Sequence, residues 1–189
     1  KFTFSTGDDK YSSKPVTIAS PMTEADFSGK GLQASGAIML AAFLPKCRYV
    51  QEYPLCLTPD IFSAIRALTS LHIGSNGIPT DKMNEIIALV EAKPAMKVLC
   101  AVPFRDKTIT ELDVSGQSLG VEGAIVIRRY LENNGALTHL DISKQAYENE
   151  YGQMVGGIGA EGAKAIAQAL KSNVSGLDLW FNCCCLLIL

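Results

Sequence analysis

The residues that most directly suggest chemistry are three glycines in the stretch VGGIGAEGAKAIAQAL (155–170). Gly157, Gly159 and Gly162 form a G-x-G-x-x-G pattern before an alanine-rich helical run, and Asp178 follows further along the chain. In dinucleotide-binding proteins this pattern lets the backbone approach a pyrophosphate, while the acid binds the ribose. That motif needs a buried strand directly before the glycines, but the residues there, NEYGQMV (149–155), are polar. We therefore expect no cofactor site.

The cysteines and histidines do not form a catalytic or metal-binding pattern. Three of the six cysteines are scattered among apolar residues, and the other three are adjacent, Cys183 to Cys185. Neither group has the spacing of a zinc site, so reduced thiols in an intracellular compartment are expected. His72 and His139 lack a nearby nucleophile or orienting group in the sequence, and we expect both to be solvated surface histidines.

A repeated pattern accounts for much of the chain. The stretches LTSLHIGSNGI (68–78), ITELDVSGQSL (109–119), LTHLDISKQAY (137–147) and GLDLWFN (176–182) each fit apolar-x-x-Leu-x-apolar-x-x-Asn/Gln, or its later part. A weaker copy is EADFSGKGL (24–32). The Asn-like position holds Lys30, Asn76, Gln117, Gln145 and Asn182. We expect these side chains to satisfy backbone groups of the turns.

A second block follows the first. LQASGAIMLAAFL (32–44), LGVEGAIVIRRYL (119–131) and IGAEGAKAIAQAL (158–170) align without a gap and share a Gly-Ala pair. Apolar residues then recur at helical spacing. Each unit is therefore predicted to be a strand, a turn and an amphipathic helix. Gly162 and Asp178 then belong to repeat geometry, whereas Gly156, Gly157 and Gly159 are assigned to the exit from an insertion.

The spacing of the central strand residues supports one period. Leu112 to Leu140 and Leu71 to Leu99 are each 28 residues apart, as are Ala25 and Tyr53. Leu140 to Leu177 is 37 residues, which indicates a nine-residue insertion at AYENEYGQM (146–154). Shorter steps before Leu71 and after Leu99 predict abbreviated repeats in the middle of the array.

A strand–helix unit of this length resembles the leucine-rich repeats of the ribonuclease-inhibitor-like type, and the resemblance covers roughly residues 24–182. It implies an α/β fold, a right-handed solenoid with a concave parallel sheet and convex helices. Residues 1–22 are expected to form an N-terminal extension or cap, in which PVTI (15–18) could add an edge strand. Residues 23–182 are the predicted repeat domain, and 183–189 form an apolar, cysteine-rich tail.

Side chains that alternate with the strand leucines must point away from the core. These positions are expected to bind a partner protein through the concave face: Asp26, His72, Glu111, Asp113, His139, Asp141, Asp178 and Trp180. Five of them are expected to lie in one column: Asp26, His72, Asp113, Asp141 and Asp178. Such a column favours a partner with a basic surface, with Trp180 as an apolar anchor. The alternative is that these acids are a common feature of the repeat and need only solvent and neighbouring serines.

The chain is expected to be a non-catalytic protein–protein interaction module, an adaptor or scaffold. One alternative is a structural accessory subunit that docks into a larger assembly through an open C-terminal end. Another is a regulator of a small GTPase, as some proteins of the family are, although Arg128 and Arg129 lie in a predicted helix away from the sheet.

Charge and hydropathy exclude further classes. The 189 residues carry a net charge of −2 without a basic run, which argues against a nucleic-acid surface. The longest apolar run is far short of the ~20 residues that span a bilayer. Membrane contact is not expected, except through the tail, where Cys183 to Cys185 could be palmitoylated. An intracellular, most simply cytoplasmic, location is predicted.

Overall fold

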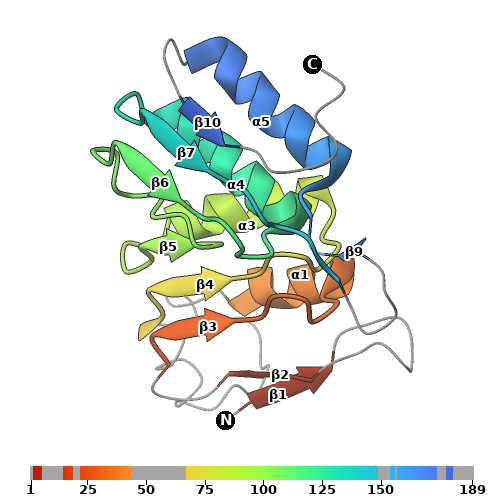
Figure 1. The fold of residues 1–189 in the computed structure, drawn as a ribbon. Coiled ribbons are helices and arrows are strands. Elements are labelled where there is room, and N and C mark those ends of the chain that lie inside the picture. Colours follow the sequence, from red (N-terminus) through yellow and green to blue (C-terminus); the bar gives the residue numbers. More distant parts are fainter. Residues whose placement is uncertain are drawn as a thin grey trace.

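The computed structural model describes residues 2–5, 15–18, 22–43, 67–148, 154–155, 157–173 and 178–180. It is a mixed α/β structure with short parallel strands on one side and helices on the other (Figure 1). The parallel strands are β3 (Glu24–Asp26), β4 (Ser70–His72), β5 (Val98–Leu99), β6 (Glu111–Asp113), β7 (His139–Asp141) and β10 (Asp178–Trp180). The helices are α1 (Gln33–Phe43), α3 (Thr80–Glu91), α4 (Gly120–Asn133) and α5 (Gly159–Asn173).

The parallel strands form two three-stranded sheets, in the orders β3-β4-β5 and β6-β7-β10. Ala25, Leu71 and Leu99 pair across the first sheet, and Leu112 pairs with Leu140 in the second. All five side chains are buried, and they belong to one hydrophobic core that also includes the inner faces of the helices. The predicted pairings of Leu71 with Leu99 and of Leu112 with Leu140 are confirmed.

The register predicted for the last strand is wrong by two residues. Leu140 pairs with Leu179, not with Leu177, so Asp178 lies opposite His139 and Trp180 lies opposite Asp141. Trp180, rather than Asp178, therefore continues the column of Asp113 and Asp141. Because side chains alternate with a period of two, a slip of two residues keeps the same face, and the pattern LDL fits either register.

The strand predicted around Tyr53 has no place between β3 and β4. These two strands pair directly, with Asp26 opposite His72. Tyr53 itself lies outside the described residues, as do Cys47, Cys56 and the tail 183–189. The first sheet therefore follows chain order without the additional strand that the 28-residue spacing suggested.

Two short antiparallel hairpins flank the parallel strands. β1 (Phe2–Ser5) pairs with β2 (Pro15–Ile18), so PVTI is a strand, but its described partner is β1 rather than the edge of a parallel sheet. Val16 of this hairpin is buried in the core. The predicted insertion holds the second hairpin, β8 (Tyr147–Glu148) with β9 (Met154–Val155).

Two glycine positions recur because the helices start and pack in the same way. Gly120 and Gly159 open α4 and α5 with φ near +62°, and Gln33 opens α1 with φ +48°. The assignment of Gly159 to the exit of the insertion is therefore wrong, since it is the first residue of α5. A Cβ on Gly162 would lie 2.7 Å from the Ala124 Cβ, so this glycine permits close packing of α5 on α4.

One connection between parallel strands that are consecutive in the chain lacks a helix. The segment 100–110, which joins β5 to β6, is a series of turns, whereas helices follow β3, β4, β6 and β7. This segment is the abbreviated repeat that the short spacing after Leu99 predicts. None of the described helices is long and apolar enough to cross a membrane.

Candidate interaction surface on the strands

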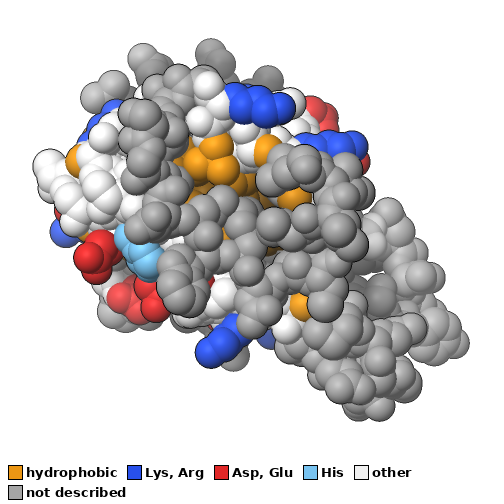
Figure 2. Space-filling view, turned by 45° about the horizontal axis from the view of Figure 1, so that its top comes forward, with side chains coloured by type: hydrophobic (Ala, Val, Ile, Leu, Met, Phe, Trp, Pro, Cys, Tyr) orange, Lys and Arg blue, Asp and Glu red, His pale blue; other side chains and the backbone are white. Residues whose placement is uncertain are grey.

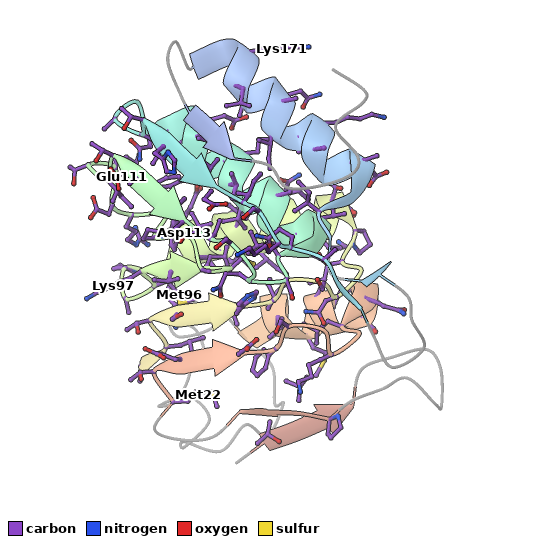
Figure 3. All side chains as sticks on the ribbon, in the orientation of Figure 1. Met22, Met96, Lys97, Glu111, Asp113 and Lys171 are labelled. Carbon is purple, nitrogen blue, oxygen red and sulfur yellow. The ribbon has the colours of Figure 1, made fainter. Side chains whose placement is uncertain are left out.

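The solvent-facing side chains of the parallel strands form a surface that we call the strand face. Its described members are Glu24, Asp26, Ser70, His72, Glu111, Asp113, His139 and Asp141. Glu111 and Asp113 project from β6 in Figure 3, and red acidic side chains lie beside a pale-blue histidine on the left of Figure 2. Asp178 and Trp180 extend the strand face, because their backbones pair with His139 and Asp141. Their side chains are not among those that the structure describes. The strand face thus brings together six of the eight predicted positions.

Each described aspartate of the column also has a structural role. The Oδ1 atoms of Asp26, Asp113 and Asp141 accept hydrogen bonds from the amide two residues later, in Ser28, Ser115 and Ser143, at 2.9, 2.9 and 2.8 Å. Such bonds define an Asx turn, which ends the strand. The serines therefore contribute backbone amides, and the aspartates are held in one orientation.

These turns lower the pKa of two of the aspartates, Asp113 and Asp26. The Ser115 backbone amide, with help from its side chain, lowers the pKa of Asp113. Partial burial would raise the pKa of Asp26, but the hydrogen bonds from Ser28 outweigh it, so this pKa is also below its usual value. A hydrogen bond to the ionised form favours that form.

His72 replaces aspartate in its repeat and is not a simple solvated histidine. Its Nδ1 accepts a hydrogen bond at 3.2 Å from the amide of Gly74, two residues later in the chain. The aspartates make the same turn contact. Its Nε2 lies 3.0 Å from the carbonyl oxygen of Gln117. Because Nδ1 accepts, Nε2 carries the proton and donates to that carbonyl. His72 therefore links the turn after β4 to the turn after β6, across the abbreviated repeat.

Beneath the strand face, amides at the Asn-like position hold the turns together. Asn76 Oδ1 accepts from the amides of Lys30 and Leu32 at 2.9 and 3.1 Å. Its Nδ2 donates to the carbonyls of Phe27, Ile73 and Gly74. Gln145 has the same role in the second sheet. Its Oε1 accepts from the Leu119 amide, and its Nε2 donates to the carbonyls of Val114 and Ser143. The expectation that these side chains satisfy turn groups is confirmed at both positions.

Gln117 does not have that role, and a buried acid takes its place. The Gln117 side chain is exposed, whereas Glu122 is only 2% exposed. Glu122 Oε1 accepts from the amides of Asn76 and Ile78 at 3.0 and 2.8 Å. Glu122 thus joins the turn after β4 to the start of α4. The sequence could not reveal this role, because the aligned position in the later repeat also holds a glutamate, Glu161, and that residue is exposed.

Among the described residues, no cluster of three or more His, Cys, Asp or Glu side chains could hold a metal ion. Cys100 is fully buried, and burial raises its pKa to about 12, which leaves the thiol unreactive. The strand face is acidic, with Lys97 projecting from the same edge as Glu111 (Figure 3).

Comparison of the chain with protein-family models, with curated proteins and with solved structures gives no match.

Proposed function

We propose that this chain is a leucine-rich-repeat protein of the ribonuclease-inhibitor-like type, whose strand face binds a basic surface of a partner protein without catalysis. The aligned strand leucines, the recurring glycines at helix starts and the turn amides of Asn76 and Gln145 support the repeat assignment. A right-handed solenoid with the strand face on its concave side is the arrangement that this family would give.

The observation that carries the proposal is the fixed pair of carboxylates on β6 and β7. Asp113 and Asp141 are directly opposite each other on neighbouring strands, and each is held by its own turn. Neighbouring strands lie about 4.8 Å apart, so the charges repel one another unless a cation lies between them. Since the side chains are already ordered, a basic partner gains the charge attraction at a small cost in side-chain entropy.

Regulation of a small GTPase has less support than this binding role. Arg128 and Arg129 lie on α4 and pair with acids of the helix layer: Arg128 with Glu132 at 2.9 Å, and Arg129 with Glu91 at 3.0 Å. Neither arginine belongs to the strand face. An accessory-subunit role remains compatible with the same binding surface.

The test is affinity capture from the native source with quantitative mass spectrometry, using charge variants that keep the turns. In the double variant D113N/D141N, each amide oxygen can still accept the turn hydrogen bond, but both charges are removed. The control is D81N/E161Q, which removes two exposed acids from the first turns of α3 and α5. We expect a captured basic protein that is lost with D113N/D141N and retained with D81N/E161Q; equal capture by both variants would contradict the proposal.

A further inference from the structure

The strand face is built on two three-stranded sheets, and the turns after β4 and β6 meet where the first sheet gives way to the second. Among the described strands, β5 and β6 do not pair with each other. The two turns are in close contact, because a Cβ on Gly74 would lie 2.7 Å from the Leu119 carbonyl oxygen and 2.8 Å from that of Ser118. The relative position of the sheets therefore depends on the contacts between these turns.

His72 makes two contacts at this junction, one with each nitrogen of its ring. Its Nδ1 accepts from the Gly74 amide at 3.2 Å, and its Nε2 donates to the Gln117 carbonyl at 3.0 Å. The first contact holds the turn after β4, and the second joins that turn to the turn after β6. Both contacts together require the neutral ring with its proton on Nε2.

A second proton on the ring is incompatible with the contact to Gly74. An imidazolium carries an N–H on each nitrogen and has no acceptor. The Nδ1–H would point at the Gly74 N–H, so either the ring turns away or the turn moves, and either movement breaks a contact at the junction. Histidine is the side chain that ordinarily changes its charge between pH 5 and 8.

An imidazolium at this position has an acceptor on the neighbouring strand. Asp26 lies directly opposite His72, on β3. Burial would raise the pKa of Asp26, but hydrogen bonds from Ser28 and the positive charges of His72 and Lys30 bring it below its usual value. Asp26 is therefore ionised in the range where histidine titrates, and its carboxylate attracts the charged ring.

The other titratable groups around the junction do not take part in this exchange. Burial raises the pKa of Cys100, after β5, to about 12, so its thiol stays neutral. A backbone hydrogen bond in its own turn lowers the pKa of Asp113 on β6. Glu122, at the start of α4, accepts two backbone amides of the turn after β4. The second histidine of the chain, His139, lies in the second sheet opposite Glu111.

We propose that His72 is a pH-sensitive switch at the junction between the two sheets of the strand face. The neutral ring closes the junction by holding the Gly74 amide and the Gln117 carbonyl. The protonated ring turns to Asp26 and releases Gly74, so the turns after β4 and β6 can move relative to each other. The switch depends only on these contacts and does not rest on the function proposed above.

The test is NMR of the isotope-labelled full chain, titrated from about pH 8 to about pH 5. At the alkaline end we expect the His72 ring to be protonated at Nε2 only. On acidification the Gly74 amide shift should follow the midpoint of the His72 ring. The protection factor of the Gly74 amide against hydrogen exchange should fall about fivefold or more, the scale of one lost hydrogen bond. The Ser115 amide, which donates to Asp113, should keep its protection throughout.

Two matched variants separate the titration from the turn. In His72→Asn the amide oxygen can still accept from Gly74, as in the aspartate turns, but the side chain does not titrate. We expect the Gly74 protection factor of this variant to be independent of pH. His139→Asn makes the same change at the other histidine and should leave the Gly74 transition in place.

Three outcomes would overturn the inference. They are a His72 proton on Nδ1 at alkaline pH, constant Gly74 protection in the unmodified chain, and a Gly74 transition that survives in His72→Asn or disappears in His139→Asn. The first two need only the unmodified chain, so they hold even if a variant folds poorly. All of the measurements are made without a partner, so their failure is separate from a failure of the strand face to bind one.

Discussion

Single buried polar residues connect the repeats at the point where the sheet is interrupted. Glu122 accepts two backbone amides, and Asn76 satisfies five turn groups. The Ser75 hydroxyl adds a hydrogen bond to the Ser118 carbonyl at 2.7 Å, beside the His72 link to Gln117. Asn76 joins the turns after β3 and β4, whereas Glu122, Ser75 and His72 bridge the turns after β4 and β6 without help from the abbreviated repeat.

Glu122→Ala tests this role. The change leaves the amides of Asn76 and Ile78 buried without an acceptor, and each such loss costs about 1–3 kcal/mol. We expect the free energy of unfolding, measured in urea, to fall by about 3 kcal/mol. The matched control is Glu161→Ala at the aligned, exposed position, which should change it by less than about 0.5 kcal/mol. Equal effects at the two positions would show that Glu122 does not join the turns.

The sequence could predict part of this residue-level picture. The alternation around the strand leucines correctly placed Asp26, Asp113 and Asp141 on the solvent side. It could not reveal that Glu122 is buried and Glu161 exposed. The two acids have the same local pattern, L/I-G-x-E-G-A, so the pattern cannot tell them apart. Only the structure shows that Glu122 meets the turn of Asn76 and Ile78.

At the scale of elements, α4 and α5 pack closely because small residues meet between them. Gly162→Ala places a Cβ 2.7 Å from the Ala124 Cβ, and Ile158 is also within 3.2 Å. Overpacking of this kind costs about 1–3 kcal/mol, partly offset by the better helix propensity of alanine. We expect a net loss of about 1 kcal/mol or more in urea unfolding.

The control for this change is Gly135→Ala in the turn after α4, where an added Cβ would meet nothing within 4 Å. Its effect should be neutral or slightly stabilising, because alanine reduces the entropy of the unfolded chain. If Gly162→Ala were equally harmless, the recurring glycine would need an explanation other than helix packing.

The end of α3 depends on a side chain from the abbreviated repeat. The Arg105 guanidinium donates to four carbonyls at or beyond the last turn of that helix. We expect Arg105→Ala to lower the free energy of unfolding by about 1–2 kcal/mol, and to increase hydrogen exchange around residues 90–97. Lys107→Ala, which changes a neighbouring exposed cation, should do neither; matching effects would argue against a capping role for Arg105.

The period in the sequence predicted most elements but not every register. The 28-residue spacing identified β4 with β5 and β6 with β7, because leucine is required at each buried centre. It misplaced β10 by two residues, since Leu177 and Leu179 fit the alternation equally well. It also proposed a strand at Tyr53, although β3 pairs directly with β4. Local pattern does not determine which strands become neighbours.

The described residues of the whole molecule present two surfaces of opposite charge. Acidic side chains cover the parallel strands, and a groove between α3 and α4 has a basic rim of Arg105, Lys107 and Arg129. A net charge of −2 conceals this separation.

We propose that the fixed carboxylates of the strand face bind a basic partner. Isothermal titration calorimetry of the captured partner against D113N/D141N and against D81N/E161Q tests it most directly. Loss of two oriented charges should raise the Kd about tenfold or more at about 0.15 M salt, with the control within about twofold of the unmodified chain. If D113N/D141N bound the partner as tightly as the control, the aspartates would serve only the turns, and the strand face would not be the binding surface.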